Sequence, residues 1–168
     1  SALEIIDFLN SSPNFAPTHD YHAALLANLL GEEKQAKSFF TKALSSSRQP
    51  SFRSLLAAGA FYELHGDPEV ARQLYKSFPK HGPEDTILKH ALSRLESGTL
   101  GKELVSTATQ GFAEALFEIS ASLFRERAYE PSLIYCQTAL FLHPGLDAAR
   151  AQLADIYVAI GNHSSAVS

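Results

Sequence analysis

The sequence is short of cysteine, of cationic excess and of long apolar runs. Cys136 is the single cysteine, so it can form neither an internal disulfide nor a cysteine zinc site by itself. Lys and Arg number 14 against 18 Asp and Glu, and the net charge of -4 gives no counterion-release drive toward nucleic acid or an anionic bilayer. No apolar run approaches the roughly 18 residues that a membrane-spanning helix requires. These absences predict no nucleic-acid partner and no direct membrane insertion.

Motifs of catalysis and of ligand binding are missing as well. The chain has no glycine-rich phosphate loop, no serine, histidine and aspartate order and no paired-carboxylate motif. His19 and His22 lie three residues apart near the start of an expected helix, but two ligands are too few for a metal site. Cys136 has no base arranged beside it, so we expect a buried structural thiol. We therefore predict no enzyme activity, no metal and no cofactor.

The feature that is present is an internal repeat. The residues Ala24, Gly31, Ala36 and Phe40 recur, displaced by 35 positions, as Gly59, Gly66, Ala71 and Tyr75. Further on, Ser120, Leu123 and Ser132 recur, displaced by 34 positions, as Ala154, Tyr157 and Ala166. The distance along the chain from Gly59 to Ser120, which occupy the same position in their repeats, is 61 residues. Because 61 equals one repeat of 34 residues plus 27, one shortened unit lies between the two pairs of repeats. Such periods are typical of helical solenoids.

Each repeat predicts two helices joined by a tight turn. Residues 52–65 carry apolar side chains near the helical period of 3.6, and Gly66 ends that helix. We expect Asp67 to cap the next helix and Pro68 to occupy its first turn, and that helix runs to about Phe78. Gly31 and Gly161 are expected to end helices in the same way. Small residues at matched positions should let the paired helices approach closely: Ala24, Ala36, Ala43, Gly59, Ala71, Ser120, Ser132 and Ala139.

The repeat also predicts how the chain is divided. We expect a partial repeat at 1–16, repeats at 17–51, 52–85 and 113–146, a degenerate hairpin at 86–112, and a partial repeat at 147–168. In the degenerate hairpin, a helix over 86–97 ends at Gly98 and a second short helix is expected over 102–110. Both termini fall inside repeats, so the natural protein is expected to extend in both directions. The predicted fold class is all-α, an array of antiparallel helix pairs with about four hairpins.

These residues resemble the tetratricopeptide repeat (TPR), whose signature is a large residue, Leu, a small residue, an aromatic, Ala, Phe, Ala and Pro. The fourth unit carries Leu116, Ile119, Ser120, Leu123, Ser132, Cys136, Ala139 and Pro144 at these positions, and the second carries Leu55, Ala58, Gly59, Tyr62, Ala71, Tyr75, Phe78 and Pro83. Phe78, Cys136 and Asp20 depart from the pattern. The resemblance implies a TPR-like solenoid, a right-handed superhelix whose concave wall consists of the first helix of each pair and binds peptides.

The resemblance also implies which residues contact a partner. The concave-face positions of the family correspond to Tyr21, Leu25, Asn28, Arg53, Leu56, Glu63, Phe117, Ala121, Phe124 and Arg125. Members that clamp a C-terminal carboxylate use Lys and Asn residues there, and this sequence has no such set. Phe117 and Phe124 form either an exposed aromatic strip for an apolar partner or part of the packing against the preceding hairpin, and both interpretations stay open.

The leading functional hypothesis is a protein-interaction scaffold that binds a peptide or a protein on the concave face. The alternatives are a non-catalytic accessory domain of a larger protein or enzyme, self-association through the terminal repeats, and RNA binding, for which the basic surface is missing. Residues 109–116 and 139–144 also resemble long bacterial TPR proteins of the cell envelope. That resemblance implies a periplasmic or envelope-associated location, with the cytoplasm as the alternative.

Overall fold

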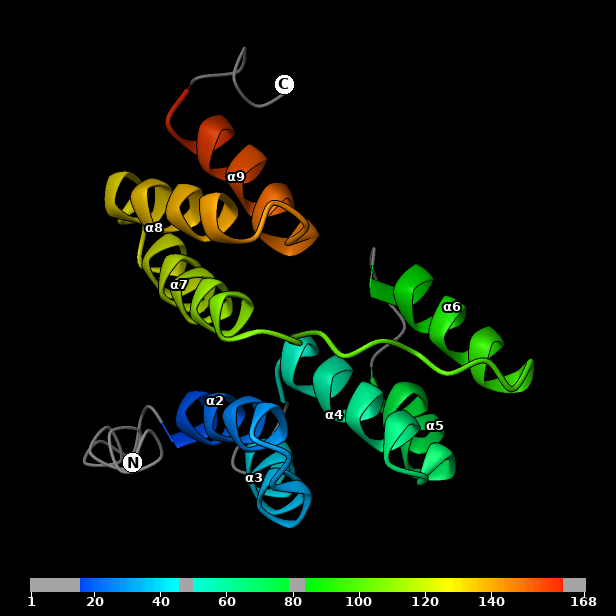
Figure 1. Cartoon of the computed structure of the whole chain (residues 1–168). Coiled ribbons are helices and arrows are strands. Elements are labelled where there is room, and N and C mark those ends of the chain that lie inside the picture. The colour runs from blue at the N-terminus through cyan, green and yellow to red at the C-terminus, as the bar shows by residue number, and fades with distance from the viewer. Residues whose placement is uncertain (1–15, 46–49, 79–83, 162–168) are drawn as a thin grey trace. The chain divides into compact units, whose positions relative to one another are not determined.

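The regular structure of the chain is helical throughout its described part. The computed structural model describes residues 16–45, 50–78 and 84–161, and within these ranges it contains eight α-helices (Figure 1). The helices are α2 (Ala16–Leu29), α3 (Glu33–Ser45), α4 (Phe52–Leu64), α5 (Pro68–Ser77), α6 (Glu84–Glu96), α7 (Ala108–Arg125), α8 (Tyr129–Leu142) and α9 (Asp147–Ala159). The predicted all-α fold class is confirmed.

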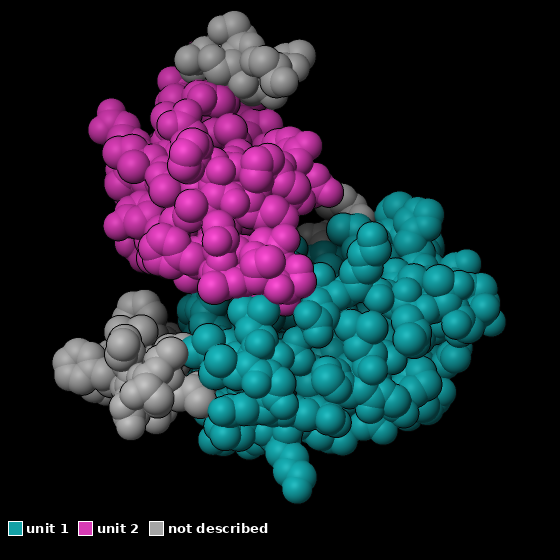
Figure 2. All heavy atoms as spheres, in the orientation of Figure 1, with its two compact units in different colours: residues 1–104 teal, residues 105–168 magenta. Residues whose placement is uncertain are grey.

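Successive helices pack as antiparallel pairs. The most extensive contacts join α2 to α3, α4 to α5, and α7 to α8, and each pair is connected by a short turn (Figure 1). In addition, α6 packs on α5 and α9 packs on α8. The described chain divides into two compact units, unit 1 over residues 1–104 and unit 2 over residues 105–168 (Figure 2). The continuous right-handed superhelix stays a prediction.

Glycines end the helices where the sequence predicts. Gly31, Gly66 and Gly161 have φ angles of 74°, 85° and 77°, and Gly98 after α6 has 70°. These left-handed conformations are strained for residues that carry a Cβ, so glycine allows the chain to reverse direction within three residues. Pro68 occupies the first turn of α5 as predicted.

The prediction that the Asp67 side chain caps α5 is wrong. Asp67 lies at the N-cap, but its side chain makes no capping hydrogen bond. Its carboxylate instead accepts a hydrogen bond from Lys37 Nζ at 2.8 Å. An ion pair with the preceding hairpin has replaced the local cap, so Asp67 joins α3 to the turn between α4 and α5.

The small residues predicted at the helix interfaces lie there. Ala24, Ala36, Ala43, Ala71, Ser120, Ser132 and Ala139 are all buried. In unit 2 the two serines are bonded reciprocally: Ser120 Oγ donates to the Ser132 carbonyl at 2.8 Å, and Ser132 Oγ donates to the Ser120 carbonyl at 2.9 Å. The hydroxyls therefore join α7 to α8, and neither hydroxyl of the pair is left without a hydrogen-bond partner.

The predicted second helix over residues 102–110 is wrong. Residues 99–107 are non-helical and form an elongated stretch, and α7 begins at Ala108 (Figure 1). Thr107 caps α7 by accepting from the Gln110 backbone N–H at 3.2 Å, while Gln110 Oε1 accepts from the Ser106 backbone N–H at 2.8 Å. This arrangement resembles a capping box, which fixes a helix start and so prevents the helix from extending backward.

Cys136 is fully buried in unit 2. Its Sγ lies 3.1 Å from the Ala149 carbonyl oxygen as a hydrogen-bond donor, and burial raises the pKa of the thiol. The predicted buried structural thiol is confirmed, because a thiol in this environment is a poor nucleophile.

Some predictions lie outside the described residues. These are the partial repeat predicted at 1–16, of which residues 1–15 are not described, the proline-rich turn at 79–83 and the residues that follow Gly161. In the ranges that the structure does describe, no helix combines the length and the apolar character needed to cross a membrane.

Candidate functional site

The residues predicted to face a partner lie on α2, α4 and α7, but they differ in exposure. Tyr21, Leu25 and Glu63 in unit 1 and Phe117 in unit 2 are buried. The half-buried residues are Asn28, Arg53, Leu56, Ala121 and Phe124, while Arg125 is exposed. Within unit 1, α2 and α4 contact each other, and Asn28 on α2 lies within hydrogen-bond distance of His65, the residue that follows α4.

The interpretation of Phe117 and Phe124 as an exposed aromatic strip on α7 is wrong. Phe117 is only 7% exposed and belongs to the core of unit 2 together with Leu116 and Ile156. Phe124 packs against the same core, and its ring centroid lies 5.6 Å from that of Tyr129 at the start of α8. Both rings are therefore packed, but in the core of unit 2, whereas the alternative interpretation placed them against the preceding hairpin.

Glu63 is the centre of a buried polar cluster. Its Oε1 accepts from the Tyr75 hydroxyl at 2.6 Å and from Arg94 Nη2 at 2.7 Å. Its Oε2 accepts from the Gly101 backbone N–H at 2.8 Å and from Arg94 Nε at 3.3 Å. The side chain of Glu63 is 0% exposed, so both oxygens are used internally and the residue contacts no partner in this state. The cluster joins α4, α5 and α6 to the chain that follows α6.

The environment of the cluster also acts on Tyr75. Burial, together with the hydrogen bond to the Glu63 carboxylate, raises the pKa of the Tyr75 phenol. The phenol is thus held in its neutral, donating form, because an ionised phenolate would face the carboxylate at short range. Tyr75 therefore acts as a donor that fixes the Glu63 side chain.

Residues 99–104, which we call the strap, lie across the face formed by α2 and α4. The Gly101 N–H binds Glu63 on α4, and the Glu103 carboxylate accepts from Asn28 Nδ2 on α2 at 3.1 Å. The amide oxygen of Asn28 lies 3.2 Å from His65 Nε2, so both ends of this predicted partner-binding side chain are occupied. The strap thus forms hydrogen bonds with α2 and α4, each of which is the first helix of its pair in unit 1.

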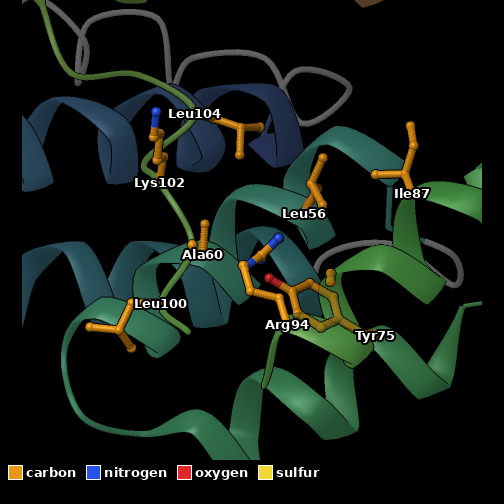
Figure 3. A pocket seen from close by; sticks show the side chains of 10 residues that line it. Leu56, Ala60, Tyr75, Ile87, Arg94, Leu100, Lys102 and Leu104 are labelled. Atoms are coloured by element: carbon orange, nitrogen blue, oxygen red, sulfur yellow. The ribbon is translucent and has the colours of Figure 1, made fainter. Parts of the chain in front are cut away.

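The strap also closes one side of a hollow in unit 1. The hollow has a volume of about 440 Å³, and its walls are Leu56 and Ala60 from α4, Tyr75 from α5, Ile87, Ala91 and Arg94 from α6, and four strap residues (Figure 3). Its lining is largely apolar, with Arg94 and Lys102 as the two basic residues. Of the predicted partner residues, Leu56 lines this hollow.

Arg94, Gly101 and the strap were not predicted from the sequence as parts of the site. Glu63 was a signal, because an acidic residue within the apolar stretch of α4 requires a buried donor. Gly98 and Gly101, only three residues apart, disfavour a helix in that segment. The partners themselves were not predictable, since Arg94 is 31 positions and Gly101 is 38 positions from Glu63.

The described residues hold no group of three His, Cys, Asp or Glu side chains that could bind a metal ion. His19 Nδ1 lies 3.3 Å from Asp20 Oδ1, and the structure adds no third ligand for His19 and His22 in this part of the chain. The site consists of a largely apolar hollow with hydrogen-bonding side chains beside it.

Comparison with known proteins gives a likeness to solved structures and no match in sequence. No family model matches the chain, and no curated protein matches it in sequence. Among solved structures, the crystal structure of MamA protein is similar with a TM-score of 0.38 and 15% identity, over 92% of this chain and 87% of that chain.

Proposed function

We propose that the chain is a non-catalytic protein-interaction scaffold that binds an extended peptide segment of a partner protein on the α2 and α4 face of unit 1. The observation that carries the proposal is the strap, an elongated stretch of backbone held on this face. The donors, acceptors and apolar surface that hold the strap on this face could also bind an extended segment of a partner protein.

The chemistry of the face supports peptide recognition. Glu63 offers an acceptor for a backbone N–H, Asn28 offers a donor for a carboxylate, and Leu56 and Ala60 supply apolar surface beside them. Extended peptides are commonly recognised through main-chain hydrogen bonds combined with apolar contacts for alternate side chains. Helices on a packed core hold these groups rigidly, which limits the entropy lost on binding.

The first test replaces Leu56 with glutamate. Peptides that bind the whole chain are selected from a displayed library, and the Kd of one is measured by fluorescence anisotropy. We expect Leu56→Glu to weaken binding at least about tenfold, because the change removes the apolar surface of Leu56 and places a carboxylate in a largely apolar hollow.

The matched control is Ile134→Glu, an equivalent apolar-to-acid change on α8 in unit 2, where Ile134 is 64% exposed. It should leave the Kd within about twofold, which corresponds to less than 0.5 kcal/mol. Equal weakening by the two substitutions, or none by Leu56→Glu, would show that peptides bind elsewhere on the chain.

A second candidate function is self-association through unit 2. On α8, Ile134 and Phe141 are 64% and 84% exposed and lie seven positions apart, which places them on one side of the helix. Exposed large apolar residues in such a row are typical of a helix that packs against another chain. This observation favours an oligomerisation domain.

Light scattering coupled to gel filtration tests self-association. If α8 mediates it, the whole chain should elute with a mass above that of the 18.3 kDa monomer, and Ile134→Glu with Phe141→Glu should restore the monomer mass. A monomeric wild-type chain at high concentration would eliminate this candidate and leave the scaffold proposal unaffected.

A further inference from the structure

We infer that the strap is an intramolecular ligand of the α2 and α4 face, and that the partner peptide has the same chemistry: a glycine, any residue, an acidic residue and a leucine in sequence. This inference rests on the proposed function and names both its partner class and its regulation. A partner would have to displace residues 99–104 in order to bind.

The strap makes specific contacts that a simple connector between helices does not need. Exposed connectors normally satisfy their backbone groups with water. Here the Gly101 N–H donates to a buried carboxylate, and the Glu103 side chain accepts from Asn28 on a different helix. These two hydrogen bonds, one to α4 and one to α2, fix which strap residue faces which helix.

The anchor at Gly101 favours glycine. A Cβ at this position would lie 2.8 Å from both Arg94 Nη2 and Glu63 Oε2. Both atoms are side-chain ends that belong to one ion pair, so a larger residue would fit only if that pair shifted. The face therefore prefers glycine where the backbone approaches Glu63.

The anchor at Glu103 selects an acid. Asn28 presents its amide N–H₂ group there, since its amide oxygen is directed to His65 Nε2. A carboxylate accepts from such a donor more strongly than a neutral side chain does. One residue further on, Leu104 is half-buried and lines the hollow with Leu56 and Ala60, whereas Lys102 between the anchors is exposed.

Tethering makes the strap a strong competitor. A segment held by both ends near its site has an effective concentration on the order of millimolar. The apparent Kd of a free peptide is then raised in inverse proportion to the fraction of chains in which the face is open. Only a peptide that binds the open face tightly can therefore displace the strap.

The experiment uses the strap sequence itself as the probe. A fluorescent peptide of residues 99–104 with blocked ends is titrated into the whole chain and into its Gly101→Pro variant, which lacks the anchoring N–H and carries a ring. We expect the peptide to bind the variant at least about tenfold more tightly than the wild type. The same proline placed in the peptide should abolish its binding to the variant.

Two further measurements keep the result decisive. A second chain in which residues 99–104 are replaced by glycine and serine should bind the peptide as the Gly101→Pro variant does, and adding Asn28→Ala should weaken that binding. In the wild type, the Gly101 amide should be protected from hydrogen exchange, and excess peptide should remove the protection.

Several outcomes would overturn the inference. Peptide binding that is equal in wild type and open variants, binding in none of them, or an unprotected Gly101 amide would each do so. If library peptides unrelated to the strap bind wild-type and open chains equally through Leu56, the inference fails while the proposed function stands. If no peptide binds any variant through this face, both fail.

Discussion

Glu63→Ala is expected to lower the free energy of unfolding of unit 1 by about 3 kcal/mol. The substitution leaves the buried Tyr75 hydroxyl and the Gly101 N–H without their acceptor and removes the ion pair of Arg94. The Arg94 side chain is 32% exposed, so water takes over part of its interaction and the estimate stays at the low end of the range for a broken buried pair. Glu63→Gln keeps the shape and one acceptor, and we expect a smaller loss of about 1–2 kcal/mol.

Native-state hydrogen exchange of the α4 amides measures this loss for unit 1 by itself. The α8 amides of unit 2 are the internal control, because the Glu63 cluster lies entirely within residues 1–104. A loss below about 0.5 kcal/mol, the range of ordinary surface substitutions, would mean that the cluster contributes nothing measurable to the fold.

Gly59→Ala is expected to destabilise unit 1 by about 2–3 kcal/mol. Alanine in place of glycine inside a helix normally stabilises by up to about 1 kcal/mol, so the sign of the effect is itself the test. A Cβ at residue 59 would lie 2.2 Å from Cε1 and 2.6 Å from the hydroxyl of Tyr75, whose ring is buried against α4. The ring would have to leave its position, and its hydrogen bond to Glu63 would be lost with it.

The same exchange measurement on α4 amides gives this value. A second-site change supplies the control: Tyr75→Leu shortens the side chain, so Gly59→Ala should cost less in that background than in the wild type. Additive losses, or a stabilising Gly59→Ala, would show that the contact between Gly59 and Tyr75 does not limit the packing of α4 on α5.

The helices and their ends were predictable because their causes are local. A glycine followed by aspartate and proline, as at 66–68, ends one helix and begins the next through backbone preferences that act within four residues. The small residues on paired helices were predictable for a related reason, since the repeat places them at matched positions. The start of α7 was equally local, but the capping residues Thr107 and Gln110 were overlooked and a helix over 102–110 was predicted instead.

The candidate site could be predicted only in part. Asn28 and Leu56 were predicted as partner residues, and the strap contacts the amide of Asn28 and lines the hollow beside Leu56. Glu63 and Phe117 occupy the predicted positions along their helices and are nevertheless buried. A position within a repeat does not tell which segment covers it, and here the covering segment departs from the repeat.

By itself, then, the sequence determined an all-α chain of short antiparallel helix pairs, because helix periodicity, glycine ends and small interface residues are properties of neighbouring positions. Only the tertiary structure decided that Glu63 gathers Tyr75, Arg94 and Gly101, and that residues 99–104 lie on the face where a partner peptide is expected. The reason is physical: a buried carboxylate accepts whichever donors folding brings to it, and those donors come from residues 12, 31 and 38 positions away.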